Sequence, residues 1–267
     1  MFKLNLLILL IISGCNSSES DFSNSNSSSA FSANLAPAKW SSNTVFPLNI
    51  SLGDDFDSQE SDAIKAASGS WNDSDSNSIE YFTHNSTSSF KANNLSGFKD
   101  SEFGIYKIQN WPSELPSMAL AVTQLYGTRR NIGKSTENIE INHADILINY
   151  DYFSFTTNNT WGYDLQTVLV HELGHFLGLY HEDNFNQSVM YPTISRYNQN
   201  RQPLSLDIEN IKSKYVRART SNISRLSDLG EEVILQFELL SNGKENIKII
   251  KGDQNEVLNV NCNNDKH

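Results

Sequence analysis

The stretch HELGHFLGLYH, from His171 to His181, restricts what this chain can fold into more than any other part of the sequence. Apolar residues recur through its first half and just before it at helical spacing, namely at Leu165, Val168, Leu169, Leu173 and Phe176. Asp164 is placed to cap the start of such a helix. His171 and His175 are four residues apart, so their side chains leave the same face, with Cβ atoms about 5–6 Å apart. The pattern therefore predicts one amphipathic helix that offers two imidazoles to one metal ion.

A third ligand can come from beyond the end of this helix. Gly178 lacks a Cβ, so it can take the left-handed conformation that ends a helix and turns the chain back. His181 would then return towards the metal. Three neutral imidazoles hold Zn²⁺ at about 2.0–2.1 Å and leave a fourth position for water, which is the arrangement of a catalytic site. Glu172 follows the first histidine, where a carboxylate can act as general base on that water.

The same stretch, with the SVMYP that follows it at residues 188–192, resembles the metzincin metalloendopeptidases and, through the Met-turn, their matrixin branch. The resemblance implies a zinc ligand at each of three positions: His171, His175 and His181. It also implies that Glu172 is the general base and that Met190 forms an apolar floor beneath the metal. From its chemistry alone, Met190 would be an ordinary core residue.

Two positions bear on the choice of branch. Astacins and serralysins carry a tyrosine two residues after the methionine, where this chain has Pro192. Matrixins usually have a small hydroxyl residue after the third histidine, where this chain has Glu182, as astacins do. The motifs therefore indicate the metzincin clan first and the matrixin branch second.

Composition excludes several classes of protein. The formal net charge of −11 argues against a nucleic-acid partner. The length of 267 residues is enough for one catalytic domain. The two cysteines are Cys15 and Cys262. That number excludes a disulfide-stapled scaffold and leaves no cysteine between them for an inhibitory propeptide. We expect a monomer whose partner is a protein or peptide substrate.

The N-terminus reads as an export signal. An apolar run from Leu6 to Ile12 is too short to span a bilayer, and residues 12–15 resemble the lipobox of bacterial lipoproteins. We predict a signal peptide at 1–14, a lipidated Cys15, and anchoring to a bacterial membrane. Asn16 favours the outer membrane or cell surface over the inner membrane. The alternative is an ordinary signal peptide cleaved nearby.

The rest of the chain divides by composition. Residues 15–35 are rich in Ser and Asn and cannot bury enough surface to fold, so we expect a disordered tether. Residues 36–217 read as an α+β, metzincin-like protease domain with a twisted mixed sheet, an active-site helix and a last helix near 205–216. The expected strands before the active-site helix are 45–52, 78–83, 103–109, 118–125 and 139–149, and the expected first helix is 58–71.

One of these strands is a candidate for binding substrate. Ala119, Leu120, Ala121 and Val122 lie where matrixins place the edge strand above the cleft. A free edge can pair with an extended peptide through main-chain hydrogen bonds. The alternative is an ordinary strand inside the sheet.

Residues 218–267 follow the expected domain as a small β extension. Strand patterns at 233–240, 246–251 and 256–260 predict a β meander. A sheet of so few strands would be only marginally stable by itself. We therefore expect the extension to pack on the catalytic domain.

Two further groups of residues could hold a metal. His143 with Asp145 could belong to a second, structural zinc, although an ordinary buried histidine is the favoured interpretation because a set of four ligands is not evident. Calcium could bind near Asp54, Asp55 and Asp57, or near Asp73 and Asp75, although none of these has the spacing of a recognised loop.

These features predict a zinc-dependent endopeptidase in which Glu172 takes a proton from water. A metallohydrolase with Glu209 as third ligand is made unnecessary by His181. A tethered binding module with an inactive metal site, and a cell-wall peptide hydrolase, remain as alternatives.

Overall fold

The computed structural model describes residues 35–74, 79–90, 92, 94–158, 161–182, 184–192, 194–215, 230–241, 245–251 and 256–261. The predicted signal peptide, Cys15, Asp75, Cys262 and all of the predicted tether except its last residue lie outside this part. Within the described ranges, no helix is both long enough and apolar enough to cross a membrane.

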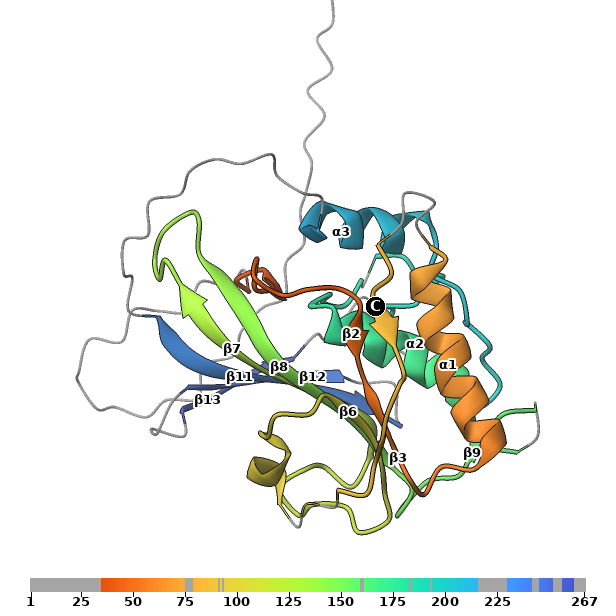
Figure 1. Cartoon of the computed structure of the whole chain (residues 1–267). Helices are drawn as coiled ribbons and strands as arrows, with labels where there is room; N and C mark the ends of the chain where they lie inside the picture. Colours follow the sequence, from red (N-terminus) through yellow and green to blue (C-terminus); the bar gives the residue numbers. More distant parts are fainter. Residues whose placement is uncertain are drawn as a thin grey trace, which may run out of the picture.

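A mixed sheet, with nine strands among the described residues, forms the centre of the molecule (Figure 1). In sheet order its strands are β13 (Glu256–Asn261), β12 (Glu245–Lys251), β11 (Glu231–Leu240), β7 (Ala119–Arg130), β8 (Asn138–Asn149), β6 (Gly104–Ile108), β3 (Ser51–Gly53) and β5 (Thr87–Ser88), and β1 (Ala38–Trp40) also pairs with β8. Strands β3, β5, β6, β8 and β1 pair in parallel, whereas β7 is antiparallel to β8. The predicted α+β class with a mixed sheet is confirmed.

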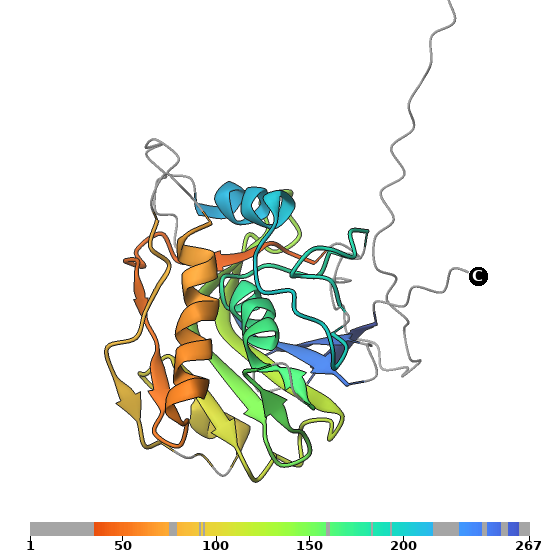
Figure 2. The ribbon, with the colours of Figure 1, turned by 90° about the vertical axis from the view of Figure 1, so that its right-hand side faces the viewer.

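Two helices lie side by side against one face of this sheet, as Figure 2 shows for α1 (Ser58–Asn72) and α2 (Leu165–Phe176). Their contact buries apolar residues of both helices against the sheet, and Trp71 donates from its indole nitrogen to the Val170 carbonyl at 2.9 Å. A third helix, α3 (Ser205–Tyr215), lies beyond the end of α2. The three predicted helices are therefore present.

Some predicted elements are shorter than expected. The strand expected at 45–52 is divided into β2 (Leu48–Asn49) and β3, and the strand expected at 78–83 is reduced to β4 (Phe82–Thr83), which pairs with β2. A second small pair joins β9 (Phe155–Thr156) to β10 (Tyr163–Asp164) just before α2, and a 3₁₀ turn spans Leu95–Phe98.

The strand expected at a free edge lies inside the sheet, so that prediction was wrong. β7 pairs with β8 on one side and with β11 on the other, and the second ladder runs from Glu231 opposite Arg129 to Leu240 opposite Ala119. Ala119, Leu120, Ala121 and Val122 all lie in this doubly paired strand. An interior strand and an edge strand can carry the same side-chain pattern, so the sequence of β7 did not indicate its second partner.

The three strand patterns of the C-terminal extension are confirmed as β11, β12 and β13. They do not form a separate unit, because antiparallel pairing of β11 with β7 makes them a continuation of the main sheet. The extension thereby widens the sheet against which α2 packs.

Candidate metal centre

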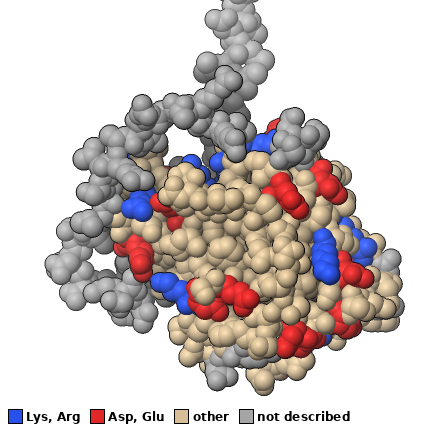
Figure 3. Space-filling view, in the orientation of Figure 1, with Lys and Arg blue, Asp and Glu red and all other residues tan. Residues whose placement is uncertain are grey.

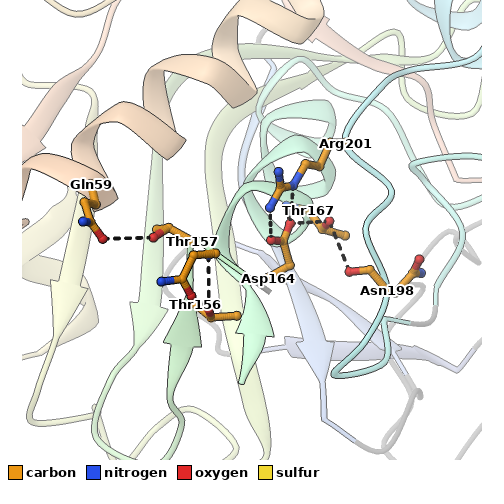
Figure 4. Close-up of polar contacts among 8 residues, drawn as sticks. Gln59, Thr156, Thr157, Asp164, Thr167, Asn198 and Arg201 are labelled. Carbon is orange, nitrogen blue, oxygen red and sulfur yellow. Dashed lines mark hydrogen bonds and ion pairs between the residues drawn. The ribbon is translucent and has the colours of Figure 1, made fainter. Parts of the chain in front are cut away.

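Helix α2 is fixed at its N-terminus by Asp164, as predicted. The Asp164 side chain accepts from the Thr167 N–H at 2.9 Å and from the Thr167 hydroxyl at 2.7 Å. Arg201 donates to both oxygens of the same carboxylate, at 2.9 Å from Nε and 2.5 Å from Nη2 (Figure 4). Burial alone would raise the pKa of Asp164, but these hydrogen bonds and the Arg201 charge outweigh it and lower that pKa. The loop after the Met-turn is thus tied to the start of the helix.

Three imidazole nitrogens converge at the other end of α2. The Nε2 atoms of His171 and His175 are 3.0 Å apart, and that of His181 is 2.9 Å from that of His175. Among the described residues this triad is the one group of three or more histidine, cysteine or acidic side chains positioned to hold a metal. The predicted shared face of the first two histidines and the return of the third are confirmed.

The other ring nitrogens show which atoms are available as ligands. The Nδ1 of His171 is 2.7 Å from the Val189 carbonyl, and the Nδ1 of His175 is 2.8 Å from the Leu179 carbonyl. A carbonyl oxygen can only accept, so each Nδ1 carries the proton and each Nε2 presents a lone pair. Burial, with the neighbouring imidazoles, lowers the pKa of His175 well below its usual value. Neutral imidazoles whose lone pairs face one another fit a divalent cation at their centre.

Gly178 makes the return of His181 possible. Its φ is +82°, the left-handed conformation predicted for the residue after the helix end, and its N–H donates to the His175 carbonyl at 2.7 Å. A Cβ at this position would lie 2.5 Å from the Ala38 carbonyl oxygen. The chain therefore needs glycine here for two reasons, its backbone conformation and the close approach of β1.

Met190 packs against α2 between the two helical histidines. It is buried, and a Cβ added at Gly174 would lie 2.2 Å from its sulfur atom. The turn that carries Met190 is held by a buried carboxylate that sequence reasoning missed: Asp207 of α3 accepts from the Ser188 hydroxyl and, at 3.3 Å, from the Val189 N–H. Ser188 in turn accepts from the Met190 N–H at 2.9 Å. A polar residue on an amphipathic helix is no signal by itself, so Asp207 could not be recognised from the chain.

Glu172 is fully buried beside the triad and contacts β7. The Thr123 hydroxyl donates to its carboxylate at 2.5 Å and lies 3.2 Å from its main-chain carbonyl. Thr123 belongs to the strand that was expected to bind substrate, but its contact with Glu172 was not expected. The two residues are far apart in the sequence, and only the placement of α2 across the sheet brings them together.

Strand β11 covers this centre. The Phe237 ring stacks on the His175 imidazole with centroids 4.2 Å apart, and meets the His181 ring edge-on at 6.3 Å. Leu239 lies in an apolar cluster whose other buried members are Leu120, Ala121, Tyr163, Val168 and Ile194. With β11 in place, His171 and Glu172 are 0% exposed and His175 is 1% exposed. Sequence reasoning placed no functional residue in this extension.

The other sites considered from the sequence are not assembled as metal sites in the described part of the chain. His143 and Asp145 form a buried pair, with Nε2 2.7 Å from the carboxylate and 2.8 Å from the Phe98 carbonyl. Burial raises the pKa of Asp145 to about 6, and the bond to Asp145 raises the pKa of His143 against the effect of its burial. No further ligand joins them among the described residues, so the ordinary buried pair describes them best.

The expected calcium positions have other roles or no cluster. Asp57 accepts from the Glu60 N–H at 2.8 Å and caps α1, in a capping box that Glu60 completes. Neither Asp54 and Asp55 nor Asp73 belongs to a metal-holding group in the described residues. On the face seen in Figure 3, acidic and basic side chains are interspersed without a continuous basic area.

Comparison with known families supports the same centre. The family model described as Matrixin matches residues 139–216, which include β8, α2, the three histidines, Met190 and α3. A search of curated proteins finds no match. The chain thus contains a matrixin-like, metzincin-type catalytic segment, and a protein or peptide is the class of substrate that this match supports.

Proposed function

We propose that this protein is a zinc-dependent endopeptidase. The observation that carries the proposal is the convergence of three imidazole Nε2 atoms, 2.9 and 3.0 Å apart, with the buried Glu172 next to His171 in the chain. The match of residues 139–216 to the matrixin model supports zinc as the metal and peptide bonds as the target.

In this proposal, His171, His175 and His181 hold the ion through Nε2, with His171 and His175 oriented by the carbonyls of Val189 and Leu179. Zinc, when bound, would lower the pKa of its water to about 7 and polarise the scissile carbonyl. The Glu172 carboxylate accepts a proton from the attacking water and then delivers it to the nitrogen of the leaving amine. Thr123 holds that carboxylate in place through its hydroxyl. The chain forms no covalent bond with the substrate.

We further propose that the protein is exported and anchored to the outer membrane or cell surface. The support is the sequence at 12–15, which resembles a lipobox, and the Ser- and Asn-rich stretch that follows. Lipidation of Cys15 would place the catalytic segment at the end of the 15–35 tether, where the monomer would act on proteins near the membrane.

The test is to measure metal content and cleavage of casein by the full chain in detergent. We expect one zinc per chain and slow internal cleavage that a chelator abolishes. Glu172→Gln should keep the zinc and reduce cleavage by at least about 10³-fold. Glu182→Gln changes the neighbouring acidic residue beyond the third histidine and should retain both properties.

The same measurements separate the rival functions. Zinc-dependent release of peptidoglycan fragments without casein cleavage would establish a cell-wall peptide hydrolase instead. Zinc binding without hydrolysis of either substrate, even when β11 no longer pairs with β7, would leave only a binding module.

A further inference from the structure

The peptide-binding edge that an endopeptidase of this architecture needs is already paired in this protein. β7 has two hydrogen-bonding edges, and β8 occupies one of them over the length of the strand. The other edge is paired with β11 from Arg129 to Ala119, and it is the edge nearer the histidines, because Phe237 of β11 stacks on the His175 ring. An extended peptide that reaches Glu172 by strand addition has to use the edge that β11 occupies.

We propose that β11 is an internal, substrate-like strand that keeps the centre latent until it leaves the edge of β7. This inference rests on the proposed endopeptidase function, since it names how access to that same site is controlled. The occupant is the chain's own segment 231–240, and an extended peptide replaces it when it leaves.

Side chains on one face of β11 fill the positions that a bound peptide would fill. Residues opposite one another in an antiparallel pair share a face, so Phe237 lies with Thr123 and Leu239 with Ala121. Phe237 stacks on the ring of His175, and Leu239 enters the apolar cluster with Val168, one helical turn before His171. Together these two side chains cover the part of the centre in which His171, Glu172 and His175 are almost completely buried, whereas His181 is partly exposed.

The cluster around Leu239 also indicates what a peptide on this edge carries. The buried side chains that Leu239 joins in this cluster are apolar or aromatic, from Tyr163 to Ile194. Leucine fills the space with an exposed fraction of 1%. A substrate that replaces β11 should therefore place an aliphatic residue of about this size at the position of Leu239.

The opposite face of β11 is suited to a strand that can leave. Gln236 donates to Gln124 of β7 at 3.1 Å, and the fully buried Glu238 pairs with Lys248 of β12. This ion pair joins β11 to β12 within the extension, so the departure of both strands together from β7 does not break it. The matched catalytic segment also ends at residue 216, before β11 begins, so the three histidines and Glu172 come from chain outside the extension.

The test uses a full-length release variant, Phe237→Ser with Leu239→Asp, in the Glu172→Gln background without metal. The matched control is Glu232→Ala, an exposed residue on the same strand. Hydrogen exchange at amides of residues 119–129 should become at least about tenfold faster in the release variant and unchanged in the control. Amides of α2 should stay protected in both, which shows that the catalytic segment remains folded.

A second measurement asks whether the vacated edge accepts a strand. A fluorescent peptide EEVILQFELLS, the sequence of residues 231–241, should bind the release variant and not the parent chain. The same peptide with Leu239 replaced by Asp should bind at least about tenfold more weakly. With Glu172 and zinc restored, the release variant should cleave casein at least about tenfold faster than the parent.

Each failure has a distinct meaning. Unchanged exchange in β7 together with absent peptide binding would overturn the inference and make β11 a permanent strand of the fold. Peptide binding and faster exchange without any cleavage by the zinc-loaded protein would leave the occupancy of β7 standing and refute the endopeptidase function. If α2 loses protection, the milder Leu239→Ala replaces the double variant, and weaker exchange protection of β7 is still required.

Discussion

The ring of Phe237 lies stacked on the imidazole of His175, with centroids 4.2 Å apart and planes inclined by 16°. The first residue comes from the C-terminal extension and the second from the active-site helix. Their contact means that the metal centre is covered on its His175 side by a segment outside the part of the chain that resembles the matrixins. The matrixin-like part of the chain therefore supplies the ligands, whereas the C-terminal extension limits access to them.

Metal binding should stabilise the folded chain. Zinc that binds the three histidines only in the folded state adds about 2.7 kcal/mol when free metal is at 100 times its Kd. We expect Tm to rise on addition of zinc and to fall again with chelator, measured by calorimetry. His181→Ala should abolish most of the shift. His84→Ala, which removes a histidine bonded to Ser68 and Ile50 away from the centre, should preserve it.

Thr123 should act as a positioning residue for Glu172. Thr123→Val keeps the shape of the side chain but removes the hydroxyl that donates to the carboxylate. We expect kcat to fall by about tenfold with little change in KM, since one charge-assisted hydrogen bond is lost. Thr123→Ser retains the hydroxyl and should restore most of the activity. Equal activity of the Val and Ser variants would show that the contact has no role in turnover.

The Asp164–Arg201 pair should make stability depend on pH at the acidic end. The pKa of Asp164 is lowered in the folded state, so its contribution is complete above the unfolded value near 3.8 and is lost as pH falls through the folded value. Asp164→Ala should lower the free energy of unfolding at pH 7 by about 2 kcal/mol, through loss of the cap and the ion pair. Asp164→Asn can still cap the helix and should cost less.

The difference between Asp164→Asn and the parent chain should shrink as the pH is lowered below about 4, because the parent carboxylate then becomes protonated as well. Urea titrations at a series of pH values measure this directly. A difference that stays constant down to pH 2 would show that the charge of Asp164 contributes nothing.

Gly174 should tolerate no side chain. A Cβ there would lie 2.2 Å from the sulfur of Met190 and 3.1 Å from the Trp71 ring. Although alanine favours helix, Gly174→Ala should lower the free energy of unfolding by about 1–3 kcal/mol because of overpacking. Gly69→Ala is the matched control, because that helical glycine has nothing within 4 Å of the added atom. It should be neutral or slightly stabilising.

Local patterns explain which predictions succeeded. Helical spacing, the Asp164 cap and the left-handed Gly178 predicted α2 and its end, because each depends on neighbours within a few residues. The four-residue spacing of His171 and His175 likewise determines their shared face. The short strands at 45–52 and 78–83 were less predictable, since where pairing stops depends on the partner strand rather than on the segment itself.

Contacts between distant segments explain what was missed. Three side chains make hydrogen bonds to another element of the fold, and no local sequence pattern marks them: Thr123, Asp207 and Arg201. The pairing of β7 with β11 could not be predicted from the sequence of β7, because β11 follows it by about a hundred residues. β7 was therefore expected at a free edge.

The sequence by itself determined the metal-binding chemistry of this protein: three histidines and a glutamate whose spacing on one helix and one turn brings their side chains together. Only the tertiary structure decided which extended segment lies next to the three histidines and the glutamate. Strand pairing is set by main-chain hydrogen bonds that any extended segment can offer, so the edge of β7 is open to many partners. Folding assigned that edge to β11 and set Phe237 against His175.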